Sequence, residues 1–193
     1  MPIKTYIIGR NKHERALNFI KKFLLEKKQA YIVCPTIYEG SMTACQSAQK
    51  LFDELSTDFF KDFSVGLLNG KQKQEEKERV MSLFAENKIS LLISTTVIEV
   101  GIDVPNAVVM MIENAERFGL SQMHQLRGRV GRGNDESYCI LVTDSKSEDT
   151  LQRIKVLCTS NDGFFIAQED LRLRGPGDIL GNRQHGDPLF KNA

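Results

Sequence analysis

The sequence Val108-Val109-Met110-Met111-Ile112 is an unbroken run of apolar residues within a chain of 193 residues. A strand that is apolar at every position is typical of a parallel sheet, because helices cover both of its faces. The run therefore indicates the centre of an α/β domain. Other short apolar runs predict further strands of the same sheet, at 6–8, 31–34, 63–68, 89–94 and 138–143.

Segments with helical periodicity separate these strands. Leu17, Ile20 and Leu24 share one face of a helix predicted over 14–27. The alternation of strands and helices predicts a parallel sheet with right-handed crossovers and helices on both faces. Ligands of such sheets collect beyond the carboxyl ends of the strands, so we expect functional residues directly after strands. Comparable spacing predicts further helices near 44–55, 80–84 and 121–127.

The pattern changes towards the end of the chain. Helices are predicted over 147–158 and 164–173, separated by Asn161-Asp162-Gly163. Residues 174–186 contain four glycines and a proline, which predicts a loop. We therefore divide the chain into a sheet domain, 1–145, and an appended helical hairpin and loop, 146–193.

The composition is that of an ordinary globular protein, with 41% hydrophobic and 26% charged residues and a net charge of +1. No apolar run is long enough for a membrane helix and no signal peptide is evident, so we expect a cytoplasmic protein that does not bind membranes. The four cysteines lack a C-x-x-C pair and should be reduced, largely buried thiols. The three histidines are scattered, so no metal site is expected.

The strongest functional signal is QLRGRVGRG, residues 125–133. Arg129 and Arg132 lie three residues apart among glycines, which let a backbone approach a phosphate closely. Arginine keeps its charge and grips phosphate oxygens with two parallel N–H groups. Gln125, one turn earlier, could orient an attacking water. A solvated basic loop is the alternative, but the glycines and the glutamine favour a phosphate site.

A second signal is STTVIEVGIDVP, residues 94–105. Hydroxyl groups at the carboxyl end of a strand, together with free backbone amides, suit a phosphodiester chain. A carboxylate after glycine, as at Asp103, suits a ribose hydroxyl. Taken singly, Thr95 could cap a short helix and Asp103 could merely shape a turn.

Together these segments resemble motifs VI and V of superfamily 2 helicases, and YIVCP at 31–35 resembles motif IV. The resemblance implies a RecA-like domain of the P-loop NTPase type. It further implies that Arg132 is an arginine finger, with Arg129 and Gln125 beside it as catalytic residues. By the same match, the ATP-facing residues would be Gly101, Asp103 and Gly128, and the DNA contacts would include Thr36, Thr95 and Thr96.

The segment 67–70 also resembles the family, although relatives commonly have histidine where this chain has Asn69. Asparagine also donates hydrogen bonds and tolerates a left-handed turn, so we assign this position no catalytic role.

The sequence contains neither a G-x-x-x-x-G-K-[ST] phosphate loop nor an acidic Asp-Glu motif after a strand. Two-domain motors carry those parts on their first domain. We therefore expect a fragment, starting at Met1, that binds no ATP or Mg²⁺ alone and is inactive alone, although the full-length enzyme uses both.

The closing segment FFIAQEDLRLRGPGDILGNRQHG, residues 164–186, resembles the translocation motif shared by RecG-type and Mfd-type DNA translocases. The resemblance implies that Arg174 and Gln184 couple ATPase cleft closure to DNA movement, and that Arg172 and Arg183 contact DNA. The RGPG and QHG sequences, with ENAERFGLSQ at 113–122, look more like RecG than Mfd. We expect the loop over 174–186 to be poorly ordered in isolation; the alternative is a mobile linker.

The resemblance therefore implies the second motor domain of an ATP-dependent double-stranded DNA translocase that remodels stalled forks and Holliday junctions in DNA repair and recombination. The implied partners are branched DNA, the missing first RecA-like domain and an N-terminal wedge domain, in a monomeric protein. Two alternatives stay open: a transcription-repair coupling translocase of the Mfd type, and a non-catalytic DNA-binding module with the same fold.

Overall fold

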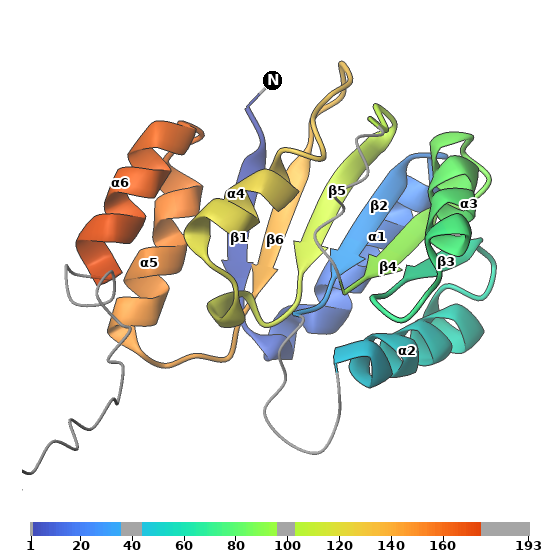
Figure 1. Ribbon diagram of the computed structural model, residues 1–193, viewed down its shortest axis with the longest axis horizontal. Helices are drawn as coiled ribbons and strands as arrows, with labels where there is room; N and C mark the ends of the chain where they lie inside the picture. Colours follow the sequence, from blue (N-terminus) through green and yellow to red (C-terminus); the bar gives the residue numbers. More distant parts are fainter. Residues whose placement is uncertain (1, 36–43, 96–102, 175–193) are drawn as a thin grey trace, which may run out of the picture.

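The structure is a computed structural model that describes residues 2–35, 44–95 and 103–174. Its centre is one sheet of parallel strands in the order β1-β6-β5-β2-β4-β3 (Figure 1). The strands are β1 (Lys4–Ile8), β2 (Gln29–Val33), β3 (Val65–Leu68), β4 (Leu91–Ser94), β5 (Ala107–Ile112) and β6 (Tyr138–Val142). This confirms the predicted fold class, and β5 extends the apolar run of the sequence by Ala107.

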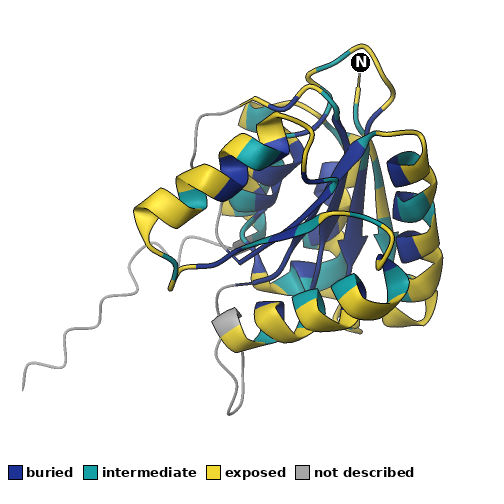
Figure 2. Ribbon diagram, turned by 90° about the vertical axis from the view of Figure 1, so that its right-hand side faces the viewer, coloured by how far each residue is buried: buried dark blue, intermediate teal, exposed yellow. Residues whose placement is uncertain are grey.

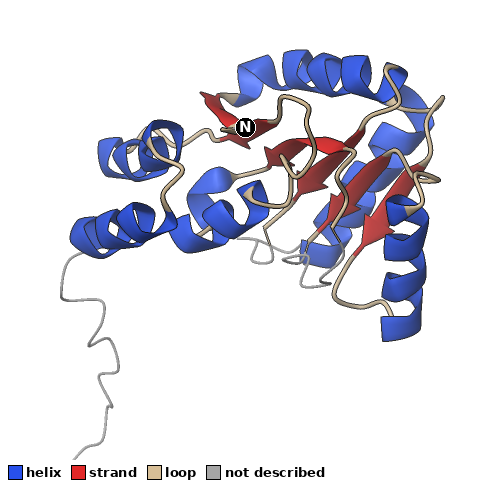
Figure 3. Ribbon diagram, turned by 90° about the horizontal axis from the view of Figure 1, so that it is seen from above, coloured by secondary structure: helices blue, strands red, loops and turns tan. Residues whose placement is uncertain are grey.

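Helices cover both faces of the sheet, as Figure 3 shows from above. The α-helices are α1 (His13–Leu25), α2 (Ala44–Glu54), α3 (Gln74–Ala85), α4 (Leu120–Arg127), α5 (Glu148–Thr159) and α6 (Gly163–Arg174). The sequence had not indicated three short helical turns: the 3-10 helices η1 (Arg10–Lys12) and η3 (Ala115–Arg117), and the π-helical turn η2 (Leu55–Phe59).

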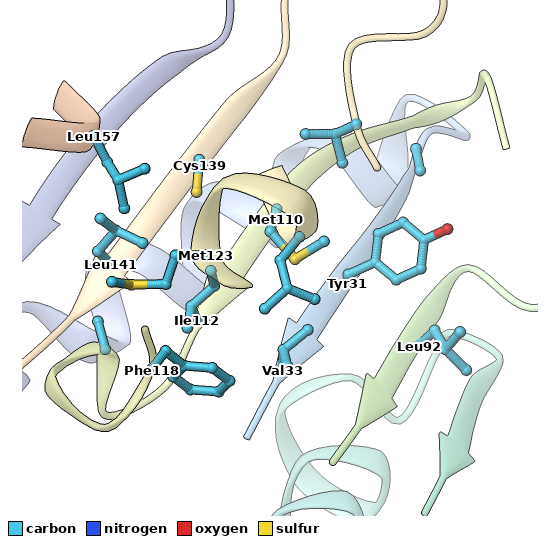
Figure 4. Packing of buried hydrophobic residues seen from close by; sticks show 14 of the residues in the cluster. Tyr31, Val33, Leu92, Met110, Ile112, Phe118, Met123, Cys139, Leu141 and Leu157 are labelled. Carbon is cyan, nitrogen blue, oxygen red and sulfur yellow. The ribbon is translucent and has the colours of Figure 1, made fainter. Parts of the chain in front are cut away.

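Two apolar clusters fill the space between the sheet and its helices. One cluster joins alternate residues of the strands to α3, α4, α5 and α6, and the other joins them to α1 and α2. Figure 4 shows part of the first cluster, where Met123 of α4 packs with Ile112 and Leu141 of neighbouring strands. Figure 2 shows the strands as buried, in dark blue, and the outer faces of the helices as exposed, in yellow. The hairpin of α5 and α6 thus contributes to the same core as the sheet.

The buried thiols agree with the sequence analysis. Cys34 and Cys139 are free and buried, and Cys158 is free and exposed. Burial raises the pKa of Cys34 and of Cys139 to about 12, so both thiols are protonated and inert at neutral pH.

Candidate functional site

An ion pair between Arg132 and Asp103 joins the two motif-like segments of the sequence. Arg132 Nη1 lies 2.7 Å from Asp103 Oδ1 and donates a hydrogen bond of 2.8 Å to Oδ2. Arg132 Nε also donates to the Gly128 carbonyl oxygen, at 3.1 Å. The Arg132 and Asp103 side chains are 43% and 55% exposed. The guanidinium is therefore held in one orientation and remains accessible to a ligand from outside.

Local backbone structure places Arg132. Helix α4 ends at Arg127, and the Gly128 and Arg129 N–H groups still donate to carbonyls of its last turn. Gly131 then adopts a φ of 79°, a conformation that favours glycine. A Cβ on Gly133 would lie 2.7 Å from the Pro105 carbonyl oxygen. These two glycines let the loop pack closely on its own chain, whereas we had expected them to serve a phosphate.

The position of this pair relative to the sheet also differs from the expectation. Asp103 and Pro105 precede β5, and Gly133 precedes β6, so the pair lies towards the amino ends of these strands. We had expected functional residues directly after strands. The reason is topological: the arginine loop, residues 128–137, leads from α4 back into the parallel strand β6, and such a loop reaches the sheet at its amino edge.

Arg129 lies in the same loop as Arg132, three residues before it. Its side chain is half-buried, and it makes no hydrogen bond or ion pair within the described part of the chain. Burial raises the pKa of Tyr31; the positive charges of Arg129 and Arg132 oppose this shift, and Asp103 reinforces it. The charges of Arg129, Arg132 and Asp103 thus all act on Tyr31 of β2, which lies on the sheet face that also carries α3 and α4.

The structure brings some of the other predicted residues to this region and leaves others apart. Gln125 is exposed on α4, one turn before Arg129, and Gly128 is exposed at the end of that helix. Gly128 has an ordinary φ of −67°, so its backbone does not require glycine. Of the remaining sequence-predicted positions, these lie outside the described residues: Thr36, Thr96, Gly101, Arg183, Gln184 and the whole 175–186 part of the predicted loop.

Thr95 follows β4 at its carboxyl end, as predicted, but it is almost completely buried at 2% exposure. Its backbone N–H donates to the Leu68 carbonyl oxygen at 3.1 Å. The free amide that we expected at this position is therefore already used within the sheet.

Arg172 and Arg174 both belong to α6, which packs against α4 and α5 (Figure 1). The Arg172 guanidinium is bound to Glu169, with Nη2 2.7 Å from Oε2. Only the backbone of Arg174 is described. A DNA contact by Arg172 would therefore exchange Glu169 for a phosphate.

Arg127 was not singled out in the sequence, although it is the largest fully buried side chain among the described residues. Its Nη1 donates to the Leu157 carbonyl oxygen of α5 and, at 3.5 Å, to Thr5 Oγ1 of β1. Its Nη2 contacts His124 Nδ1 at 3.0 Å. Burial lowers the pKa of Arg127. The signal was available, because Arg127 shares the inward helical face of Leu120 and Met123.

A second polar cluster lies at the carboxyl ends of β1, β5 and β6. Glu113 directly follows β5, is 4% exposed, and contacts His13 Nε2. Arg10 Nη2 lies 3.6 Å from Glu113 Oε2, and Arg10 also binds Asp144 through its backbone N–H and Nε. The backbone hydrogen bond from Arg10 is the main cause that lowers the pKa of Asp144. These groups fix the chain beyond three strands, although Glu113 Oε2 has no hydrogen-bond partner among the described residues.

Neither a metal site nor a membrane span is found in the described part of the chain. Within 2–35, 44–95 and 103–174, no three His, Cys, Asp or Glu residues are grouped so that they could hold a metal ion. In the same residues, no helix is both long and apolar enough to cross a membrane.

The sheet and the arginine loop define the class of protein to which this chain belongs. Residues 12–134 match the family model described as helicase conserved C-terminal domain, and the chain belongs to that family.

Within the family, the chain is similar to proteins named ATP-dependent DNA helicase RecG. It is 50% identical over 192 residues to the one from Synechocystis sp., covering all of this chain and 23% of the relative. It is 48% identical to that from Bacillus subtilis, covering 99% and 28%. The chain thus spans about a quarter of the length of the curated relatives that it matches.

Solved structures give the same picture. A structure of RecG bound to a three-way DNA junction matches with a TM-score of 0.79 and 44% identity, covering 93% of this chain and 23% of that one. The Mss116p DEAD-box helicase domain 2 bound to an RNA duplex matches with a TM-score of 0.63 at 19% identity, covering 80% and 59%. The second likeness concerns the fold alone.

Proposed function

We propose that this chain is the second motor domain of a RecG-type ATP-dependent DNA helicase, in which Arg132 stabilises the transferring phosphoryl group of ATP. The observation that carries the proposal is the exposed contact of Arg132 Nη1 with both oxygens of the Asp103 carboxylate. An accessible guanidinium that binds a carboxylate can bind the oxygens of a phosphate in its place. The whole-chain similarity to RecG proteins supports the helicase part of the proposal.

The nucleotide would lie against the surface that carries Arg132 and Asp103. The phosphate-binding loop would be supplied by the first motor domain. When that domain closes, Arg132 exchanges Asp103 for a phosphate, and Asp103 becomes free to accept a hydrogen bond from the ribose. Arg129, half-buried and without a partner among the described residues, adds a second positive charge. Gln125 lies one helical turn away and orients the attacking water. Mg²⁺, bound on the first domain, would neutralise phosphate charge, and this chain alone would bind neither ATP nor Mg²⁺.

Two observations support the proposed DNA binding: the similarity to RecG proteins, and the threonines that follow strands at the carboxyl edge of the sheet. A relative that matches 93% of this chain binds a three-way DNA junction. We propose branched double-stranded DNA, such as forks and Holliday junctions, as the substrate, and repair and recombination as the context. Thr36 and Thr96 would contact the DNA backbone, whereas Thr95, which is buried, would have to become exposed to do so. Arg172 and Arg183 would add contacts, and Arg174 and Gln184 would couple ATP turnover to movement of the hairpin and loop (146–193).

We propose that the full-length protein also contains a first RecA-like domain and a wedge domain and works as a monomer in the cytoplasm. The similarity of the whole chain to RecG favours this reading over the Mfd-type alternative. A non-catalytic module would leave the accessible Arg132 without a role.

The test is the Arg132→Ala variant of the full-length protein, assayed for ATP hydrolysis with forked DNA. An arginine finger is worth about 10³–10⁵ in rate, so we expect turnover to fall by about 10³ or more while fork binding stays within about twofold. The matched control is Lys61→Ala, which removes an exposed cation on the opposite side of the sheet and should leave turnover unchanged. Turnover of Arg132→Ala within tenfold of the parent would remove Arg132 from this role.

A second experiment tests the division of labour between the domains. This chain alone should show no ATPase activity, and mixing it with the first motor domain should restore DNA-stimulated hydrolysis. Hydrolysis by this chain alone, or a mixture that stays inactive with forked DNA, would contradict the proposed arrangement.

A further inference from the structure

An apolar groove lies beside β1, on the face of the sheet that α1 covers only in part. Its volume is about 380 Å³, and its lining includes Tyr6 and Ile8 of β1 and Phe19 of α1. Helix α1 packs over β2 and β5, and Phe19 meets Tyr138 of β6 edge-to-face with a ring separation of 5.0 Å. The cover therefore reaches β6, while of β1 it includes only Ile8.

The opposite face of β1 is covered. Helix α5 packs against β1 there, and Ile7 contributes to the cluster on that side. Side chains alternate between the faces of a strand, so Tyr6 and Ile8 point to the α1 face. Tyr6 is 50% exposed although it lies inside a strand. Parallel strands are normally covered by helices on both faces, whereas within 2–35, 44–95 and 103–174 the α1 face of β1 is covered only in part, through Ile8.

The rim of the groove is positively charged. Lys12 and Arg15 are exposed, both line the groove, and neither side chain forms a hydrogen bond or ion pair within the described part of the chain. A segment that fills the groove would therefore carry apolar residues on one side and carboxylates opposite these two cations. An amphipathic helix with an acidic flank meets both conditions.

We infer that this groove receives an amphipathic, acidic-flanked helix from another part of the full-length polypeptide. The matched relatives extend well beyond this chain, which spans only 23% and 28% of their lengths. Most of such a protein thus lies outside these residues and can supply the missing layer. The inference does not depend on the role of Arg132, because the groove lies on the other face of the sheet.

The test uses the full-length protein with the photoreactive residue benzoylphenylalanine in place of Tyr6. Illumination should form an intramolecular crosslink to a segment outside the 193 residues, and peptide mass spectrometry should find Asp or Glu within two helical turns of the attachment point. The matched control carries the same probe at Leu25, which is 69% exposed at the far end of α1 and should crosslink at most one tenth as efficiently.

Charge reversal provides the second measurement. The double variant Lys12→Glu and Arg15→Glu should lower the Tyr6 crosslink yield at least fivefold, whereas Lys77→Glu on α3 should leave it unchanged. A crosslink to a second copy of the protein, a yield equal to that at Leu25, or a yield insensitive to charge reversal would overturn the inference. ATPase activity measured on the same samples keeps this result separate from the proposed function.

Discussion

Replacement of Arg127 by methionine should destabilise the chain by about 2 kcal/mol. Helix α5 ends at Thr159, so the Leu157 carbonyl oxygen has no partner within the helix and accepts from Arg127 instead. A hydrogen bond from a charged donor contributes about 1.5–3 kcal/mol, and an unsatisfied buried carbonyl costs about 1–3 kcal/mol. Methionine fills much of the same space, so the cavity contribution should be small.

One effect opposes this loss. Burial lowers the pKa of Arg127, which shows that the buried charge itself is unfavourable, and methionine removes that cost. We therefore place the net effect slightly below the sum of these two contributions, at about 2 kcal/mol. The slope of unfolding free energy against urea concentration is about 2 kcal/mol per molar for a domain of this kind, so the urea midpoint should fall by about 1 M.

The assay is urea unfolding of this chain followed by circular dichroism, with Arg79→Met as the matched control. Arg79 is exposed on α3, and its replacement should shift the midpoint by less than about 0.3 M, since exposed substitutions change stability by about 0.5 kcal/mol or less. A midpoint for Arg127→Met equal to that of Arg79→Met would show that the Arg127 contacts contribute no net stability.

Further outcomes follow from individual contacts. Gly163→Ala should lower the unfolding free energy by about 1–3 kcal/mol, because the new Cβ would lie 2.8 Å from His124 Nε2, and a thermal melt with an unchanged midpoint would contradict that packing. Asp103→Asn should change the unfolding free energy of this chain by no more than about 1 kcal/mol, because exposed ion pairs contribute little, and urea titration measures it. Cys34 and Cys139 should resist iodoacetamide at pH 8 in the folded chain, because burial raises both pKa values to about 12. Cys158 is exposed and should be alkylated. Mass spectrometry that finds Cys34 modified as fast as Cys158 would count against the burial of Cys34.

The sequence predicted the elements of the fold well and their arrangement less completely. Apolar runs such as 108–112 identify strands because a parallel strand is buried on both faces, and every predicted strand is present. The same local information cannot give the order of the strands, which depends on contacts between distant segments. It also could not predict the π-helical turn at Leu55–Phe59, since hydrophobic spacing alone does not report one extra residue in a helical turn.

The candidate site shows the same limit. Motif resemblance paired the segment of Asp103 with that of Arg132, and the structure places these two side chains in contact. We expected functional residues directly after strands, but Asp103 precedes β5 and Arg132 precedes β6. The expectation considered only the carboxyl edge of the sheet, whereas these two loops lead into strands at the amino edge. The role of Arg127 was not predicted, because its charge favours an exposed position, whereas its spacing from Leu120 and Met123 places it on the buried face of α4.

Arg127 and Arg132, five residues apart, show how one basic segment can hold two different kinds of arginine. Arg127 is 2% exposed and binds a backbone carbonyl, a hydroxyl and a histidine, so moving it would leave a buried carbonyl without a donor and two partly buried groups without this partner. Arg132 is 43% exposed and binds a single carboxylate, an arrangement that costs at most about 1 kcal/mol to exchange for another anion. In the proposed motor, the fixed arginine holds α4 against α5 and β1 while the exchangeable one meets the phosphate. Replacing Arg127 should therefore lower stability first, whereas replacing Arg132 should lower turnover with little change in stability.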